Sequence, residues 1–372
     1  MKKSILFVIE SLAGGGAEKV LITLLNHLGD DYYNLTLCCV TNVGKYLDRI
    51  PSHVHYQYLL PDYSSLSGIS RLCYKLKYHL IYHWLPARLV YKWFIPKGND
   101  IEIAFLEGNA TRVLSGSLNK TAVKIAWVHI DIAHAHKKDT AIYNSYNQII
   151  TVSNGSKKAF LDTFPDVQTP ISVIHNPIDR DEIIRLAADN NDVPSKKDDT
   201  IRLVTIGRLT EQKAFDRLLR IVHKLNKENL SLELWIIGEG HLRESLQEYI
   251  DENRMGRVVT LWGFQYNPYK FLSKSDLFVC SSLAEGFSTA ATEAIILGLP
   301  VVTTDCSGMD ELILKNDCGI ITKNNENAFY DGLKSILSDK ALLLKYKQGA
   351  LTRSLDFQID YLMIPFLRLL QQ

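Results

Sequence analysis

Short apolar runs alternate with longer amphipathic segments along most of the 372 residues. Runs of roughly four to eight apolar residues between turn signals predict buried strands, and longer segments with apolar residues at helical spacing predict helices. Because strands and helices alternate, the sequence predicts an α/β fold with parallel sheets. The predicted strands are 5–9, 35–40, 55–59, 100–105, 121–128 and 148–152 in the first half, and 201–206, 232–237, 258–262, 276–280, 301–304 and 319–321 in the second.

A polar stretch separates the two sets of strands. Residues 189–200 are DNNDVPSKKDDT, and we expect a linker at 181–200. The length of the chain also favours two domains over one. The sequence therefore predicts an N-terminal domain at 1–180 and a C-terminal domain at 201–354.

Asp179 and Asp181, beside this boundary, form the DxD pattern that binds metal in some transferases. Here they follow Pro177 at a predicted helix start. Aspartates at a helix start accept hydrogen bonds from free backbone N–H groups and offset the helix dipole. We therefore interpret the pair as capping residues.

One strand, loop and helix start in the second half combines chemistry suited to a sugar nucleotide. After the strand 276–280, Gly286 allows a tight turn and Ser288 or Thr289 can cap the next helix. The free N–H groups of that helix start suit a diphosphate. Glu285 and Glu293 can accept hydrogen bonds from sugar hydroxyls at the carboxyl end of the strand. The alternative is that one glutamate offsets the helix dipole and the other is solvated.

Two cations follow the first strand of the second half. Arg208 and Lys213 lie on the connection between the strand 201–206 and the next helix. Arginine offers a planar fork to phosphate oxygens and lysine a point charge. Together they can stabilise the charge that develops on a departing diphosphate. The alternative is an exposed loop with ordinary surface charges.

In the first half, Gly14–Gly16 open a predicted helix. Lys19 stands where a dinucleotide fingerprint needs its third glycine, so that fingerprint is absent. The turn still permits close approach of an anion or a sugar, or it is a plain strand-to-helix turn. His129 ends the strand 121–128, where it is placed for a ligand or is a structural histidine. With Asp131, His134 and His136 it could suggest a metal site, but the spacing matches no standard one.

Composition excludes several classes of function. The formal net charge of +1 predicts no nucleic-acid partner. Six cysteines form no CxxC pair, which favours reduced thiols in the cytoplasm. The N-terminal apolar run is too short for a signal peptide, and no run approaches the roughly 20 apolar residues that cross a bilayer.

The segment 68–97 has the most unusual composition in the chain. It holds six Lys or Arg residues, seven aromatic residues and no acidic residue, and Pro86 divides its helical pattern. Basic residues beside Tyr and Trp suit an anionic membrane surface. The alternative is a pair of amphipathic helices packed on the domain with their basic face in water.

The ordered set of these motifs resembles the retaining glycosyltransferases of family 4, which have the two-domain GT-B architecture. The hallmark of that family is a pair of glutamates separated by seven residues, as Glu285 and Glu293 are. The resemblance implies two doubly wound, Rossmann-like domains that face each other across a cleft. It also implies that a terminal helix, 355–372, returns to the N-terminal domain. The other segments that carry the resemblance are Gly14–Val20, Trp127–His129, Asn176–Asp179, Gly207–Lys213 and Gly238–Gly240.

The resemblance also implies roles for the candidate residues. Arg208, Lys213 and the helix start would bind the diphosphate, Glu293 the ribose and Glu285 the donor sugar. His129 would lie near the reacting bond, and Phe264 would border the nucleobase unless it is a core residue. No metal or other cofactor is implied. The implied catalytic set is Glu285, His129, Arg208 and Lys213, and the implied substrate-binding set is Gly15, Gly16, Arg208, Lys213, Phe264, Gly286, Phe287, Ser288, Thr289 and Glu293.

We therefore expect a retaining hexosyltransferase. It would move a hexosyl or N-acetylhexosaminyl group from a UDP-sugar to a lipid-linked acceptor of the undecaprenyl type, or to a saccharide, and form an α-glycosidic bond in bacterial polysaccharide biosynthesis. The N-terminal domain would bind the acceptor and lie on the inner face of the cell membrane through 68–97. Two alternatives are a nucleotide-sugar epimerase of the same architecture, which would convert the donor without an acceptor, and a non-catalytic nucleotide-sugar-binding protein.

Overall fold

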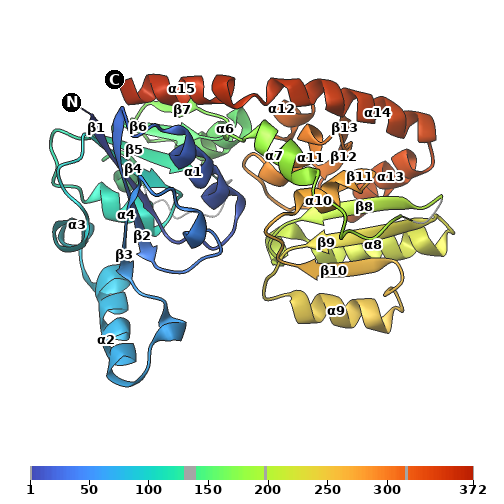
Figure 1. Ribbon diagram of the computed structural model, residues 1–372, viewed down its shortest axis with the longest axis horizontal. Coiled ribbons are helices and arrows are strands. Elements are labelled where there is room, and N and C mark those ends of the chain that lie inside the picture. The colour runs from blue at the N-terminus through green and yellow to red at the C-terminus, as the bar shows by residue number, and fades with distance from the viewer. Residues whose placement is uncertain (1, 130–139, 197–198, 315–316, 372) are drawn as a thin grey trace. The chain divides into compact units, whose positions relative to one another are not determined.

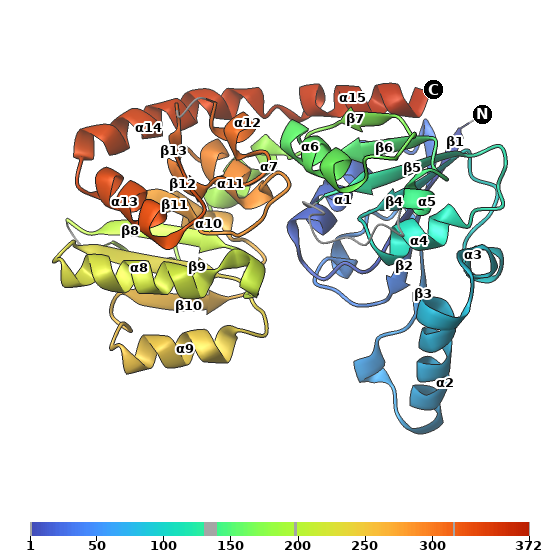
Figure 2. The ribbon, with the colours of Figure 1, turned by 180° about the vertical axis from the view of Figure 1, so that it is seen from behind.

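The chain divides into two compact α/β units. Unit 1 comprises Met1–Pro177 together with Met363–Gln372, and unit 2 comprises Ile178–Leu362. Each unit is described by itself below. The computed structural model (Figures 1 and 2) describes residues 2–129, 140–196, 199–314 and 317–371.

The described residues of unit 1 form a seven-stranded sheet in the order β3-β2-β1-β4-β5-β6-β7, in which every neighbouring pair is parallel. All five residues of β4 are buried, as expected for a parallel strand covered on both faces. The strands are β1 (Lys3–Ile9), β2 (Tyr33–Thr41), β3 (His55–Leu60), β4 (Ile101–Phe105), β5 (Val123–Val128), β6 (Gln148–Thr151) and β7 (Ile171–Val173). The helices are α1 (Gly16–His27), η1 (Leu47–Arg49), η2 (Tyr63–Ser65), α2 (Gly68–His79), η3 (Leu80–Trp84), α3 (Ala87–Phe94), α4 (Asn109–Ser115), α5 (Thr140–Tyr143) and α6 (Asn154–Thr163).

The described residues of unit 2 form a six-stranded parallel sheet in the order β10-β9-β8-β11-β12-β13. Helix α8 buries one face, with apolar residues at helical spacing from Phe215 to Leu225. The strands are β8 (Ile201–Ile206), β9 (Leu232–Ile237), β10 (Val259–Gly263), β11 (Leu277–Cys280), β12 (Val301–Thr304) and β13 (Gly319–Thr322). The helices are α7 (Arg180–Ala187), η5 (Glu211–Lys213), α8 (Phe215–Lys227), α9 (Arg243–Glu252), α10 (Tyr269–Ser273), α11 (Thr289–Ile296), α12 (Met309–Ile313), α13 (Glu326–Leu337), α14 (Lys340–Arg353) and η6 (Ser354–Asp356), and α15 (Ile359–Gln371) continues from unit 2 into unit 1.

Each sheet has a point at which its strand order reverses. In unit 1 the reversal falls between β1 and β4, and in unit 2 it falls between β8 and β11. Ligands of open α/β sheets bind outside the carboxyl ends of the strands at such a point. The fold therefore predicts that ligands bind at the loops after these four strands.

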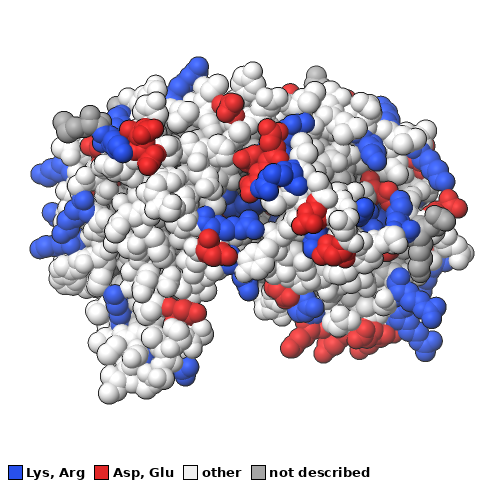
Figure 3. All heavy atoms as spheres, viewed as in Figure 1, with Lys and Arg blue, Asp and Glu red and all other residues white. Residues whose placement is uncertain are grey.

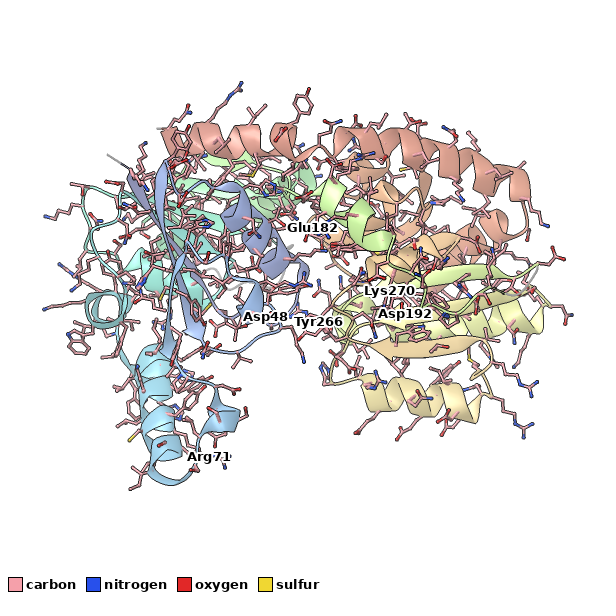
Figure 4. The ribbon with its side chains drawn as sticks, in the orientation of Figure 1. Asp48, Arg71, Glu182, Asp192, Tyr266 and Lys270 are labelled. Carbon is pink, nitrogen blue, oxygen red and sulfur yellow. The ribbon has the colours of Figure 1, made fainter. Side chains whose placement is uncertain are left out.

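The predicted linker 181–200 differs from the structure. Its first residues belong to α7, which lies in unit 2. Ile183 and Ala187 of this helix are buried, and Asn267 Nδ2 donates to Leu186 O at 2.9 Å. Figure 4 labels Lys270 and Asp192, whose ion pair of 2.5 Å holds the chain after α7 to α10. The helix start predicted at Asp179 thus continues as a packed helix through the first residues that we expected to form the linker.

The helix capping expected at the boundary is present. Asp179 is the N-cap of α7, and its side chain accepts from Glu182 N at 2.9 Å. At the other end of the chain, the residues that belong to unit 1 begin at Met363, whereas the sequence predicted a return at 355–372. Lys3 Nζ donates to Leu370 O at 2.7 Å and fixes this helix beside β1.

The segment 68–97 forms two helices joined by the π-helical turn η3. Pro86 precedes α3, as expected from its lack of an N–H donor. Helix α2 has no buried residue, and Figures 1 and 2 show it projecting away from the sheet of unit 1. Tyr74 and Tyr78 of α2 pack against the core of unit 1, whereas Ile69, Leu72 and Leu76 are exposed and need another reason to be apolar.

Candidate active site

Two loops are joined at the strand reversal of unit 2, one after β8 and the other after β11. Leu283 N donates to Gln212 O at 2.7 Å, and Gln212 Nε2 donates to Ala284 O at 2.9 Å. Ser281 Oγ donates to Lys213 O at 2.8 Å. Main-chain and side-chain bonds thus fix the two loops to each other. This is the place where the topology predicts a ligand.

Lys213 and Glu285, one from each loop, form an ion pair. Lys213 Nζ lies 2.6 Å from Glu285 Oε1, and the glutamate residue is only 7% exposed. Ser282 Oγ donates to the same oxygen at 2.5 Å, and Cys280 Sγ lies 3.8 Å from it. Because all three contacts are to Oε1, they leave the second carboxylate oxygen uninvolved. That oxygen can accept from a ligand hydroxyl.

The charge of Lys213 is maintained by its partner. Burial is the largest influence and lowers the pKa of Lys213. The charge of Glu285, the neighbouring Cys280 and the hydrogen bond to Glu285 together outweigh it, so the pKa lies above the ordinary value. Lysine has three N–H donors, and one donor faces Glu285. The ammonium group therefore stays charged at neutral pH and can also donate to an anionic ligand.

Glycines permit the close packing beneath this pair. A Cβ atom on Gly238, which has φ of +144°, would lie 1.9 Å from Gly207 O. A Cβ atom on Gly240 would lie 2.3 Å from Leu209 O. Gly207 lies against the side chain of Lys213, with 3.1 Å between a built Cβ atom and Lys213 Cε. Larger residues at these positions would displace the loop that carries the lysine.

The start of α11 matches the prediction. Ser288 is its N-cap and accepts from Ala291 N at 3.3 Å, so α11 begins at Thr289. Gly286 and Phe287 are buried in the preceding loop. Glu293 lies in the second turn of α11 and is 4% exposed.

The other two candidates of unit 2 lie nearer to solvent. Arg208 is exposed, and after burial its positive charge is the second influence that lowers the pKa of Lys213, which is nevertheless raised overall. Phe264 follows β10, is half-buried and packs edge-to-face with Tyr266 at 5.1 Å. Phe264 is thus outside the fully buried core of its unit.

His129, Gly15 and Gly16 belong to unit 1. The His129 ring packs against Phe105 at 4.5 Å and stacks on Trp127 at 5.7 Å. Its backbone N–H donates to Glu107 Oε2 at 3.0 Å. Burial lowers the pKa of His129 to about 3, so the ring is neutral at physiological pH. Neither ring nitrogen has a hydrogen-bond partner among the residues that the structure describes.

Gly15 is the N-cap of α1, and Gly16 is its first residue. A Cβ atom on Gly15 would lie 2.5 Å from Glu18 Oε2, so a carboxylate already lies against this turn. A neutral hydroxyl is therefore a better ligand for the turn than an anion. Asp131, His134 and His136 lie outside the described residues. Within the described ranges, no three His, Cys, Asp or Glu side chains gather in a way that could hold a metal ion.

Sequence reasoning missed the residues that support the β11 loop. Arg217 of α8 is buried and donates to Ser281 O and, at 2.9 Å, to Asn324 Oδ1. Asn324 Nδ2 in turn donates to Leu283 O at 2.9 Å. A signal for Arg217 was present, since a single arginine interrupts the apolar face of α8. Ser282 could have been chosen as a hydroxyl near the end of a buried strand.

Comparison with known proteins finds a family match within unit 2. Residues 188–353 match the family Glycosyl transferases group 1. They include Arg208, Lys213, Glu285 and Glu293. The matched region thus contains both of the joined loops.

The whole chain is similar to one bacterial enzyme in particular. It is 28% identical over 355 residues to the N-acetylgalactosamine-N,N'-diacetylbacillosaminyl-diphospho-undecaprenol 4-alpha-N-acetylgalactosaminyltransferase of Campylobacter jejuni, with 94% of each chain covered. It is also 29% identical over 256 residues to an uncharacterized glycosyltransferase of Methanocaldococcus jannaschii, with 59% of this chain and 62% of the other covered.

Solved structures define the fold. Anabaena HepE, crystallised with UDP and glucose, matches with a TM-score of 0.75 at 18% identity over 99% of both chains. The sucrose-phosphate synthase of Thermosynechococcus elongatus matches with a TM-score of 0.79 at 14% identity over 100% of this chain and 99% of the other. With two parallel-sheet α/β domains, the protein has the GT-B fold, as the resemblance implied.

Proposed function

We propose that the protein is a retaining glycosyltransferase that moves a hexosyl or N-acetylhexosaminyl group from a UDP-sugar to a lipid-linked saccharide. The observation that carries the proposal is the Lys213–Glu285 pair at the strand reversal of unit 2, inside the region that matches the glycosyltransferase family. A cation and a carboxylate at one ligand site match the two halves of a sugar nucleotide, which are an anionic diphosphate and a neutral, hydroxyl-bearing sugar.

In this proposal the cations act on the leaving group. Arg208, Lys213 and the N–H groups at the start of α11 hold the diphosphate. Negative charge grows on the diphosphate as the bond to the sugar breaks, so these groups stabilise the transition state more than the ground state. Binding of UDP and acceleration of transfer then depend on the same residues.

The carboxylates hold the neutral parts of the donor. Glu285 accepts from hydroxyls of the sugar through the oxygen that the Lys213 contact leaves uninvolved. Glu293 accepts from the ribose hydroxyls. Glu285 has no nucleophilic role in this scheme, and the product is an α-glycoside made from an α-linked donor. Phe264 borders the nucleobase. The loop that holds the diphosphate is formed by Gly286, Phe287, Ser288 and Thr289. In unit 1, His129 lies near the reacting bond, and Gly15 and Gly16 contact the acceptor.

The relative and α2 both support the proposed acceptor class. The Campylobacter enzyme is named for a diphospho-undecaprenol saccharide, and we propose a saccharide on a similar lipid here. None of the helices that the structure describes has the length and apolar character needed to cross a bilayer. Contact with a lipid acceptor would therefore require a surface element.

The segment 68–97 supplies such a surface. Packing on the domain accounts for Tyr74 and Tyr78 of α2 but not for its other apolar residues, because Ile69 is 81%, Leu72 69% and Leu76 53% exposed. Trp84 and Trp93 are also exposed. In Figure 3 the surface over α2 is largely uncharged with scattered Lys and Arg, and Figure 4 labels Arg71 near its tip. We propose that this surface lies on anionic lipid at the inner face of the cell membrane.

The experiment that tests the function is a transfer assay with a panel of UDP- and GDP-sugars. The acceptor is undecaprenyl diphosphate carrying a saccharide that ends in N-acetylgalactosamine, in phosphatidylglycerol vesicles. We expect transfer from one UDP-sugar and an α-linkage in the product. Conversion of the donor without an acceptor would instead identify an epimerase, and binding without turnover would identify a non-catalytic nucleotide-sugar-binding protein.

Transfer by Glu285→Gln at the wild-type rate would contradict the role given to this carboxylate. The matched control is Glu211→Gln on the neighbouring turn, whose carboxylate pairs with His241 in solvent and has no part in the proposed site.

A further inference from the structure

Glu10 is a half-buried carboxylate with no role in the scheme above. It follows β1 directly, at the strand reversal of unit 1. Its Oε1 accepts a hydrogen bond from Tyr82 Oη. Its Oε2 is buried and meets no hydrogen-bond donor at bonding geometry among the described residues. Burial raises the pKa of Glu10, and Tyr82, Asn109 and the charge of Arg112 partly offset the effect of burial. Because a buried polar atom without a partner is destabilising, an unpartnered oxygen at a ligand-binding edge indicates a hydrogen bond still to be made.

Tyr82 connects Glu10 to the proposed membrane segment. It lies in η3, the π-helical turn between α2 and α3, and such turns occur often at functional sites. Arg112 of α4 donates to Ile81 O in the same turn, and its Nη1 lies 3.5 Å from Leu85 O. The turn is thus fixed to the end of the sheet by two side chains, one of which ends on Glu10.

A line of tyrosines leads from α2 to this contact. The rings of Tyr63 and Tyr74 lie 5.1 Å apart, those of Tyr74 and Tyr78 lie 6.2 Å apart, and those of Tyr78 and Tyr82 stack at 4.2 Å. Stacked rings hold one another in place. A change in the position of α2 can therefore alter the position of Tyr82, and through Tyr82 that of the Glu10 side chain, without a large movement of the sheet.

The neighbouring strands end in similar chemistry. β4 pairs with both β1 and β5, so Glu107 after β4 and His129 after β5 lie along the same edge as Glu10. Glu107 and His129 are joined by the backbone hydrogen bond described above. The neutral imidazole can donate one hydrogen bond and accept another. With two carboxylates, this edge disfavours a diphosphate and favours neutral hydroxyls.

We propose that Glu10 binds a hydroxyl of the acceptor saccharide through Oε2, and that Tyr82 orients it for this task. Glu10 is then an acceptor-binding residue, and Tyr82 is a positioning residue. Through Tyr82, acceptor binding is linked to the binding of 68–97 to the lipid surface. This inference rests on the proposed function, because it names the acceptor side of the same reaction.

The test compares E10Q, Y82F and the control Y78F by steady-state kinetics. The probe is the vesicle-borne undecaprenyl diphosphate saccharide, with the UDP-sugar that the wild-type protein uses. We expect E10Q to raise the acceptor KM by about tenfold to a hundredfold, the range for loss of a hydrogen bond to a charged group, with the donor KM changed less than about twofold. Y82F should raise the acceptor KM by a smaller factor, on the order of threefold to tenfold.

The control Y78F removes a hydroxyl from the neighbouring ring and leaves the Glu10 contact in place, so both KM values should stay near those of the wild type. Y82F removes a single oxygen atom, so it keeps the test decisive if E10Q does not fold. An unchanged acceptor KM in both E10Q and Y82F would overturn the inference, as would an equal rise in both KM values. A wild-type protein that neither transfers sugar nor binds UDP would overturn the proposed function instead.

Discussion

Replacement of Lys213 by Met begins a pair of variants that separate the contribution of the Lys213–Glu285 ion pair to stability from its contribution to UDP binding. Methionine keeps the length of the side chain and removes its charge. The change leaves Glu285 charged and 7% exposed, without the cation that lies 2.6 Å away. Breaking a buried pair in this way costs about 3–5 kcal/mol. Because Ser282 and Cys280 still contact Oε1, we expect the lower end, about 3 kcal/mol, in the free energy of unfolding.

The double variant Lys213→Met, Glu285→Gln shows which part of the loss is functional. Glu285→Gln removes the buried negative charge that Lys213→Met leaves without a partner. Most of the lost free energy of unfolding should therefore return. The affinity for UDP should not return, because the double variant still lacks the ammonium donor. Loss of one hydrogen bond to a charged group weakens UDP binding by about tenfold to a hundredfold.

Urea unfolding and calorimetric titration with UDP measure the two effects on the same preparations. The pH chosen for this cycle matters little near neutrality. The raised pKa of Lys213 means that its stabilising charge is present through neutral pH and is lost only as the pH rises through the lysine pKa. The reasoning is refuted if the double variant binds UDP like the wild type, or if Lys213→Met alone is as stable as the wild type.

Three further predictions concern other parts of the chain. Gly238→Ala should lower the free energy of unfolding by at least about 2 kcal/mol, because its φ of +144° is strained for alanine and its Cβ atom would meet Gly207 O. The control is Gly256→Ala, whose Cβ atom meets nothing within 4 Å, and it should change the free energy of unfolding little. Urea unfolding of the wild type should show that the free energy of unfolding falls as the pH drops from about 6.5 toward 3, by up to about 1.4 kcal/mol per pH unit. The cause is that His129 binds a proton in the unfolded state but stays neutral in the folded state. An equally steep fall in His129→Phe would contradict this. Exchange of three lysines in the segment 68–97 for glutamate should weaken co-sedimentation with phosphatidylglycerol vesicles by about a hundredfold, at roughly 1 kcal/mol for each basic residue, and unchanged co-sedimentation would leave the segment as a solvated face. The three lysines are Lys75, Lys77 and Lys92.

Local patterns predicted the elements well because their causes are local. The strand limits agree within about two residues for most strands, since a buried parallel strand is a run of apolar residues that ends at a polar turn. Asp179 was interpreted as a cap and Ser288 was one of two candidate caps, because a short oxygen side chain before a helix commonly accepts from a free backbone N–H group.

Contacts between distant residues were harder to predict. Lys213 and Glu285 were assigned to different parts of the ligand, and nothing in either local sequence shows that they bond to each other across 72 residues. Glu10 was missed because its burial depends on Tyr82, also 72 residues away. The first contact results from strand order, which places the ends of the nonconsecutive strands β8 and β11 side by side. The second depends on the turn η3, which places Tyr82 beside the residue that follows β1.

A crystal structure with bound UDP would show whether Lys213 and the start of α11 hold the diphosphate. We expect the diphosphate at the strand reversal of unit 2, with an oxygen about 3 Å from Lys213 Nζ and the N–H groups at the start of α11 directed toward it. A structure in which UDP binds elsewhere, with Lys213 and Glu285 still paired and distant from the nucleotide, would contradict this expectation.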